Sequence, residues 1–83
     1  MLGTYTESRW GKEQFCEDII NPIVRQDGYL SAHYVYDSER KEEWVEIYAL
    51  ASKAEGKPIR VCVTADSCCA MLRDVLRKLE WEL

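Results

Sequence analysis

The stretch from Glu42 to Glu55 constrains the fold of this chain more than any other, because its residues suit both a helix and a strand. As a helix it has Ser38 as its cap, acidic residues in the first turn, alanines as good helix formers and Gly56 as its stop. As a strand it alternates two sets of side chains, one of Glu43, Val45, Ile47, Ala49 and Ala51, and the other of Glu42, Trp44, Glu46, Tyr48 and Leu50.

The number of strands decides between these two interpretations. A helix at this place leaves the chain with only two strands, joined as a parallel pair. Two-stranded sheets are marginally stable, and purely parallel sheets are normally larger. We therefore predict a strand over about residues 43–51, which gives a sheet of three strands.

The two neighbouring strands have clearer patterns. From Tyr29 to Tyr36 the residues are mostly aromatic or small apolar ones, typical of a strand, and the charged residues from Asp37 to Lys41 then interrupt the pattern as a hairpin loop does. One side of this strand carries Leu30, Ala32, Tyr34 and Tyr36. Between Pro58 and Thr64 apolar and polar residues alternate strictly, which predicts a half-buried third strand.

Helical spacing dominates the two ends of the chain. Residues 7–27 carry apolar side chains at Trp10, Phe15, Cys16, Ile19, Ile20, Ile23 and Val24. Asn21 and Pro22 suit an N-cap followed by a first-turn proline, so we expect a kink or restart there, and Gly28 suits the helix end. Asp66 or Ser67 is expected to cap a terminal helix with apolar positions Cys69, Leu72, Val75, Leu76, Leu79 and Leu83.

These elements predict one α+β domain over residues 1–83, with the order helix, three-stranded antiparallel meander, helix (αβββα). A chain of 83 residues is too short for two separate cores. No apolar stretch approaches the roughly 20 residues that cross a bilayer, and residues 1–10 do not resemble an export signal. We therefore expect no membrane association, a cytoplasmic location and four reduced cysteines.

Charge narrows the class of partner. Eleven Lys and Arg residues against fifteen Asp and Glu residues give a net charge of −4, so no overall positive field attracts a phosphate backbone. Free nucleic acid is therefore not expected as a partner. The acidic residues concentrate in one segment, at Asp37, Glu39, Glu42, Glu43 and Glu46.

The motifs of catalysis and cofactor binding are missing from the sequence. The four glycines are dispersed, so they form no phosphate loop, and the spacing of Cys62, Cys68, Cys69 and His33 does not suit zinc. A helix N-terminus lowers the pKa of a thiol, which makes Cys68 a candidate redox residue, but nothing indicates that His33, the one histidine, serves as its base. We predict no enzyme, no catalytic residue, no metal and no cofactor.

Without catalytic motifs, the function has to be sought in the residues that the chain exposes on its surface. If the helices pack on one face of the sheet, the other face shows aromatic residues interleaved with acids, which suits binding to a basic protein surface. If the helices cover opposite faces, Trp44 and Tyr48 are simply core. The first arrangement predicts these partner-binding residues: Glu42, Trp44, Glu46, Tyr48, Asp37 and Glu39.

The leading hypothesis is thus a non-catalytic, acidic protein-binding module that occupies a basic groove of a larger protein. This short, acidic, helix-plus-meander profile is similar to that of many inhibitors from phages and mobile elements, including anti-CRISPR proteins and other nucleic-acid mimics, although no motif places the chain in such a family. The alternative is a homodimeric structural or regulatory domain whose exposed sheet is its own interface. A third hypothesis is a thiol redox or sensor protein.

Overall fold

The computed structural model describes residue 6 and residues 8–49 and 57–82. Its architecture confirms the predicted α+β order of helix, three-stranded antiparallel sheet and helix. The elements, in chain order, are α1 (Arg9–Phe15), the π-helix η2 (Cys16–Ile20), α2 (Asn21–Gln26), β1 (Ser31–Asp37), β2 (Glu42–Tyr48), β3 (Ile59–Cys62) and α4 (Cys68–Glu82).

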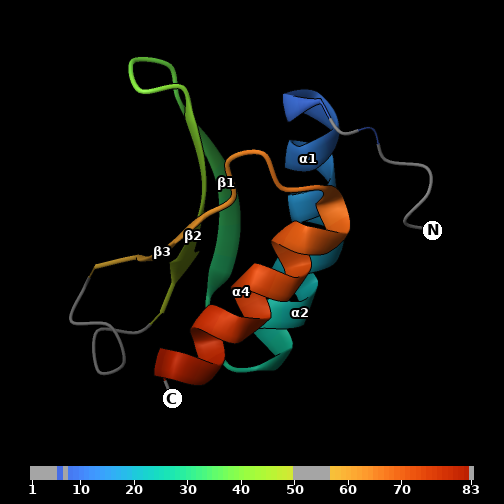
Figure 1. Ribbon diagram of the computed structural model, residues 1–83. Coiled ribbons are helices and arrows are strands. Elements are labelled where there is room, and N and C mark those ends of the chain that lie inside the picture. Colours follow the sequence, from blue (N-terminus) through green and yellow to red (C-terminus); the bar gives the residue numbers. More distant parts are fainter. Residues whose placement is uncertain (1–5, 7, 50–56, 83) are drawn as a thin grey trace.

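The described part of the segment with two interpretations forms a strand over Glu42–Tyr48, which lies at the centre of the sheet. The strand order is β1-β2-β3, and β2 pairs antiparallel with both neighbours. The strand ends at Tyr48, earlier than predicted, and residues 50 and 51 of the prediction lie outside the described residues. Figure 1 shows α1, α2 and α4 together on one side of the sheet, so the helices form one layer and the sheet forms the other.

The first three helical elements are continuous with one another. The residue before η2 and the residue before α2 are both in helical conformation, and the N–H of Asn21 donates to the carbonyl of Cys16, five residues earlier. The irregularity expected near Pro22 is therefore a π turn that precedes the proline. The predicted N-cap role of Asn21 is wrong, because its side-chain oxygen instead accepts a hydrogen bond of 2.9 Å from the N–H of Ala32 on β1.

Side chains from all layers meet in one apolar core. The fully or almost fully buried apolar residues are Phe15, Cys16, Ile20, Val24, Tyr29, Ala32, Val45, Ile47, Val61, Val63, Cys68, Met71, Val75 and Leu79. The sheet contributes alternate residues of each strand, as period-two patterning requires.

The buried face of α4 agrees with the predicted one at Val75 and Leu79 and differs from it elsewhere, while Leu83 lies outside the described residues. Cys69 is exposed and Leu76 is 37% exposed, whereas Cys68 and Met71 are buried. The two apolar sets share Val75 and Leu79, and in the first turn the core side is taken by the residue one position earlier than predicted. Ser67 caps the helix, since its hydroxyl accepts from the N–H of Ala70 at 3.1 Å.

The start of α1 is held by a close approach of the preceding segment. Ser8 is the N-cap, and its hydroxyl accepts from the N–H of Gly11 at 3.2 Å. A Cβ on Gly11 would collide with the hydroxyl and carbonyl oxygens of Thr6, so only glycine fits there. No helix within residues 8–49 and 57–82 is long and apolar enough to cross a membrane.

Candidate protein-binding face

The sheet face that points away from the helices is the candidate site, and we call it the open face. On β2, Val45 and Ile47 point into the core, so the residues that alternate with them point the other way. Strand register then brings the neighbouring strands into line, with Trp44 between Val35 and Cys62. The residues on the open face are Ser31, His33, Val35, Asp37, Glu42, Trp44, Glu46, Tyr48, Arg60 and Cys62.

A chain of polar contacts orders the middle of the open face. The Oε2 of Glu46 lies 3.3 Å from the Nε of Arg60, and its Oε1 accepts a hydrogen bond of 2.9 Å from the hydroxyl of Tyr48. The guanidinium carbon of Arg60 lies 4.3 Å from the ring centre of Trp44, within cation–π range. The hydrogen bond to Glu46 raises the pKa of the Tyr48 phenol. Two aromatic rings are thereby held in place beside a carboxylate.

The histidine occupies the edge of this face. The ring of His33 meets that of Tyr48 edge-on, with centres 5.7 Å apart. Its Nδ1 lies 3.4 Å from the Oε1 of Glu17 on η2, and its Nε2 lies 3.0 Å from the hydroxyl of Ser31. The predicted position of His33 on the sheet surface is confirmed, since 47% of its side chain is exposed.

The six predicted partner-binding residues fall into two groups. Glu42, Trp44, Glu46 and Tyr48 share the open face, and Trp44 and Tyr48 do not belong to the core, so the arrangement that buries them is wrong. Asp37 pairs with Glu42 at the end of β1, where the hairpin begins, and Glu39 lies in the hairpin itself.

The hairpin gives Asp37 a structural role. Its Oδ1 accepts from the N–H groups of Glu39 and Arg40 at 3.0 and 3.2 Å, which holds the turn. Lys41 completes the turn in the left-handed region, with φ of 56°. Glu39 is exposed in the turn, next to Arg40 and Lys41.

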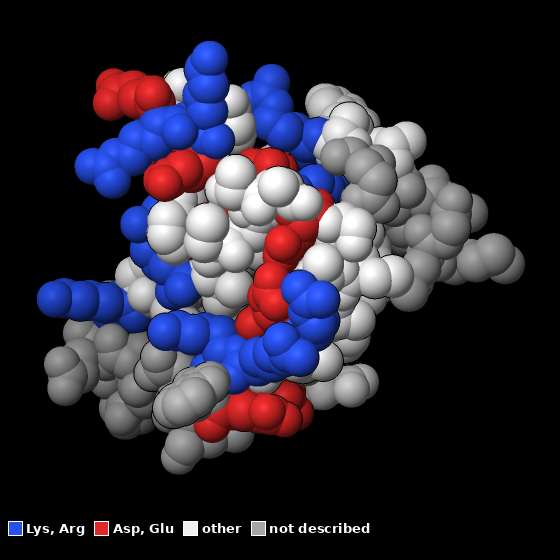
Figure 2. Space-filling view, in the orientation of Figure 1, with Lys and Arg blue, Asp and Glu red and all other residues white. Residues whose placement is uncertain are grey.

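Charge on the molecule is mixed rather than uniformly acidic. On the side seen in Figure 2, acidic and basic side chains are interspersed. On the open face the carboxylates of Asp37, Glu42 and Glu46 outnumber the one guanidinium of Arg60. The local excess of negative charge is therefore small, and the aromatic rings are the larger feature.

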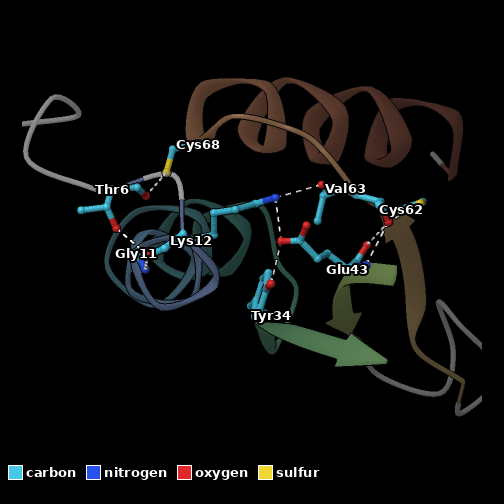
Figure 3. A network of polar contacts seen from close by, with 10 residues as sticks. Thr6, Gly11, Lys12, Tyr34, Glu43, Cys62, Val63 and Cys68 are labelled. Atoms are coloured by element: carbon cyan, nitrogen blue, oxygen red, sulfur yellow. Dashed lines mark hydrogen bonds and ion pairs between the residues drawn. The ribbon is translucent and has the colours of Figure 1, made fainter. Parts of the chain in front are cut away.

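The opposite face of β2 carries a buried ion pair that the sequence patterns did not predict. Only 2% of the Lys12 side chain is exposed, and its Nζ lies 2.7 Å from the Oε1 of Glu43. The ammonium also donates to the carbonyl of Val63 at 3.1 Å, and the hydroxyl of Tyr34 donates to the same Glu43 oxygen at 2.7 Å. Figure 3 shows these groups converging from α1, β1, β2 and the segment after β3.

Burial and the contacts around Glu43 shift the pKa values of Glu43 and Tyr34 in opposite directions. Burial alone would raise the pKa of Glu43, but the hydrogen bonds from Lys12 and Tyr34 outweigh burial, and the pKa is lowered. The pKa of Tyr34 is raised, first by burial and then by its hydrogen bond to Glu43. The carboxylate is thus held in its charged form, which the buried ammonium requires.

A sequence signal for this pair exists. Lys12 precedes Phe15, Cys16 and Ile19 by three, four and seven residues, so it lies on the apolar stripe of its helix. Glu43 likewise shares the side of its strand with Val45 and Ile47. Two opposite charges, each on an apolar face, indicate a buried pair.

The cysteines divide into two buried and two exposed thiols, all free. Cys16 is completely buried, and burial, followed by the nearby Glu17 and Glu13, raises its pKa to about 12. Cys68, the candidate redox residue, is 2% exposed and donates to the carbonyl of Thr6 at 3.6 Å. Cys62 on the open face and Cys69 on α4 are exposed.

The sequence patterns also did not predict that the carboxyl groups of Asp66 and Asp74 interact. Asp66 precedes α4 and Asp74 lies on it, and burial, followed by the interaction with Asp74, raises the pKa of Asp66 to about 6. Arg73 lies 3.0 Å from Asp74 and favours its charged form.

No family model matches the chain, and no curated protein and no solved structure matches it significantly. Among residues 8–49 and 57–82, no three His, Cys, Asp or Glu side chains are grouped to hold a metal ion. Any function must therefore be argued from the described side chains themselves.

Proposed function

We propose that this chain is a non-catalytic protein-binding module whose open face binds a partner with a basic surface. The observation that carries the proposal is the position of Trp44 and Tyr48 on a sheet face that bears no helix in the described part of the chain. Tyrosine and tryptophan are enriched at the centres of protein interfaces, because they bring large area at low entropic cost.

Charge supports the basic partner. Glu42 has no cationic partner among the described residues, whereas Glu46 already contacts Arg60. An incoming lysine or arginine would therefore find Glu42 free and would find Glu46 in competition with Arg60. Charges at a rim contribute mainly association rate and specificity, so we expect the aromatic rings to supply most of the affinity.

The same charges disfavour the homodimer alternative. A two-fold symmetric dimer through the open face would bring together two copies of a surface on which negative charge is in excess. We expect a monomer at micromolar concentration in sizing chromatography with light scattering. A dimer that dissociates in Trp44→Ala would favour the alternative instead.

An inhibitory role would follow if the basic partner surface is a nucleic-acid groove. Occupancy by the open face would then exclude the phosphate backbone from the same positive charges. Nucleic acid should compete with the chain for the isolated partner, and both interactions should weaken as salt increases.

Charge reversal tests the face directly. The double variant Glu42→Lys with Glu46→Lys should capture at least tenfold less partner from a lysate of the source cells. The control is Asp27→Lys with Glu80→Lys, which changes net charge equally at two exposed positions off the open face. Equal losses from both variants, or no loss from either, would show that the face is wrong.

Thiol footprinting supplies an internal control. Cys62 lies beside Trp44 on the open face, whereas Cys69 lies on α4. Alkylation of the purified complex should slow at Cys62 and stay unchanged at Cys69. Protection of Cys69 alone would place the partner on the helical layer.

A further inference from the structure

The outer edge of β1 has backbone hydrogen-bonding groups that no neighbouring strand pairs within the described residues. The N–H of Val63 donates to the carbonyl of Glu43, so the backbone groups of Glu43 point toward the β3 side. In an antiparallel sheet the backbone N–H and C=O groups of alternate residues point to opposite neighbouring strands. The backbone groups of Glu42, Trp44 and Glu46 therefore point toward β1. Their partners on β1 are the odd-numbered residues. The backbone N–H and C=O groups of the even-numbered residues of β1 therefore point away from β2, across the outer edge of the sheet.

The position of Asn21 supports this assignment independently. The N–H of Ala32 donates to the Asn21 side chain rather than to β2. Tyr34 and Tyr36 have the same parity, so their N–H and C=O groups point across the same outer edge. Within the described residues, neither amide has a hydrogen-bond partner on that side. Asn21 therefore provides a hydrogen-bond acceptor for the first outward-pointing amide of β1, and the amides of Tyr34 and Tyr36 are left without one among the described residues.

A groove accompanies the open part of the edge. It has a volume of about 420 Å³ and is lined by Ser8, Arg9, Trp10, Glu13, Tyr34 and Tyr36. The side chain of Trp10 is 80% exposed, more than any other large apolar residue described. Arg9 lies with its guanidinium carbon 4.0 Å from the ring centre of Tyr36, so this cation already has an aromatic partner.

These features specify the kind of occupant. Unpaired amide and carbonyl groups that repeat every second residue match the backbone of another strand, not an isolated side chain. Alternate side chains of an added strand point to the same face, so one of them would enter the groove beside Trp10. With three aromatic rings in its lining and its cation engaged on Tyr36, the groove suits a large apolar side chain.

We propose that the outer edge of β1 at Tyr34 and Tyr36 binds an extended segment of a partner protein, which adds as a fourth strand and places a large apolar side chain in the groove beside Trp10. This site lies on the edge and on the helical side of the sheet, so it does not rest on the role proposed for the open face. An interaction lost in the Glu42→Lys, Glu46→Lys variant belongs to the open face. An interaction lost in Trp10→Ala belongs to this edge.

Displayed peptides provide the probe. Random seven-residue peptides are selected on the wild-type chain and counter-selected on Trp10→Ala. We expect enriched peptides with a large apolar residue between β-forming residues, and at least tenfold weaker binding to Trp10→Ala. Absence of any peptide that distinguishes the two chains would overturn the proposal.

The backbone contribution has its own matched pair. Tyr36→Ala removes the ring and keeps the amide, whereas Tyr36→Pro removes both, and proline is tolerated at an outward-facing amide of an edge strand. Binding of the selected peptide should be weaker in Tyr36→Pro than in Tyr36→Ala. Equal binding by these two variants would exclude strand addition.

Hydrogen exchange locates the bound segment in the unmodified chain. Without peptide, the amides of Tyr34 and Tyr36 should exchange faster than those of His33 and Val35, which point toward β2. The selected peptide should slow the exchange of Tyr34 and Tyr36. Slowing only at the open face would contradict the proposal, and slowing that depends on protein concentration without peptide would assign the edge to a second copy of the chain.

Discussion

The two faces of β2 carry the same chemical group in two environments. On the buried face, Glu43 pairs with Lys12 and accepts from Tyr34, both at 2.7 Å. On the open face, Glu46 lies 3.3 Å from Arg60 and accepts from Tyr48 at 2.9 Å. The cation of the buried group is 2% exposed and that of the open group is 47% exposed.

Burial changes what each group can contribute. Removal of one partner from a buried ion pair leaves an uncompensated charge and typically costs about 3–5 kcal/mol. An exposed pair contributes about 0–1 kcal/mol, because water and salt screen it. The group around Glu43 therefore fixes α1 against the sheet, whereas the group around Glu46 can exchange its contacts for those of a partner at little cost to the fold.

The largest expected effect comes from neutralising each glutamate separately. Glu43→Gln should lower the free energy of unfolding by about 3 kcal/mol, since the buried Lys12 ammonium loses its counter-charge. Glu46→Gln should lower it by less than about 1 kcal/mol. Urea unfolding of the two variants measures both values, and equal losses would contradict the distinction between the faces.

Acid should remove the contribution of the buried group. The pKa of Glu43 is lower in the folded chain than its ordinary value of 4.5, so its stabilising effect is present above that pH and is lost as pH falls through the folded pKa. Asp66 acts in the opposite direction, because its pKa of about 6 favours the folded state at low pH.

A comparison of variants separates the two carboxyl groups. The difference in unfolding free energy between wild type and Glu43→Gln should shrink as pH falls below 4.5, because Asp66 is present in both chains and cancels. Urea unfolding over a pH series measures this difference. A difference that stays constant with pH would mean that Glu43 is not the titrating group.

The tyrosines offer a smaller, matched comparison. Tyr34→Phe removes a hydrogen bond to a partly buried carboxylate and should cost about 1–2 kcal/mol. Tyr48→Phe removes the corresponding bond on the open face, where water replaces it, and should cost less than about 0.5 kcal/mol. Thermal or urea unfolding distinguishes these outcomes, and a larger loss for Tyr48→Phe would reverse our assignment of the two faces.

Local periodicity was sufficient for the order of elements and for the side of β2 that meets the core. Alternation at Val45 and Ile47, together with the argument from strand number, predicted the strand. Whether the helices cover one face of the sheet or both was left open by the sequence, and the fold places them on one face. On α4 the prediction was right at Val75 and Leu79 and wrong at the start of the helix, because Cys68 and Cys69 are equally apolar and only packing chooses between them.

Contacts between residues distant in sequence were beyond such patterns. The partner of Asn21 is Ala32 on a different element, so a local N-cap looked sufficient. The groove beside Trp10 forms between α1 and β1, so the sequence of either segment alone does not predict it. Lys12 and Glu43 each break an apolar pattern, but their pairing requires the fold.

The separation of stability from binding on the two faces of β2 is tested most directly by Trp44→Ala, measured in one preparation for both urea unfolding and partner capture. We predict a loss of less than about 1 kcal/mol in unfolding free energy, because Trp44 lies outside the core, and at least a tenfold loss of captured partner. Capture that persists in the folded variant, or a loss of stability as large as that of Glu43→Gln, would contradict the account.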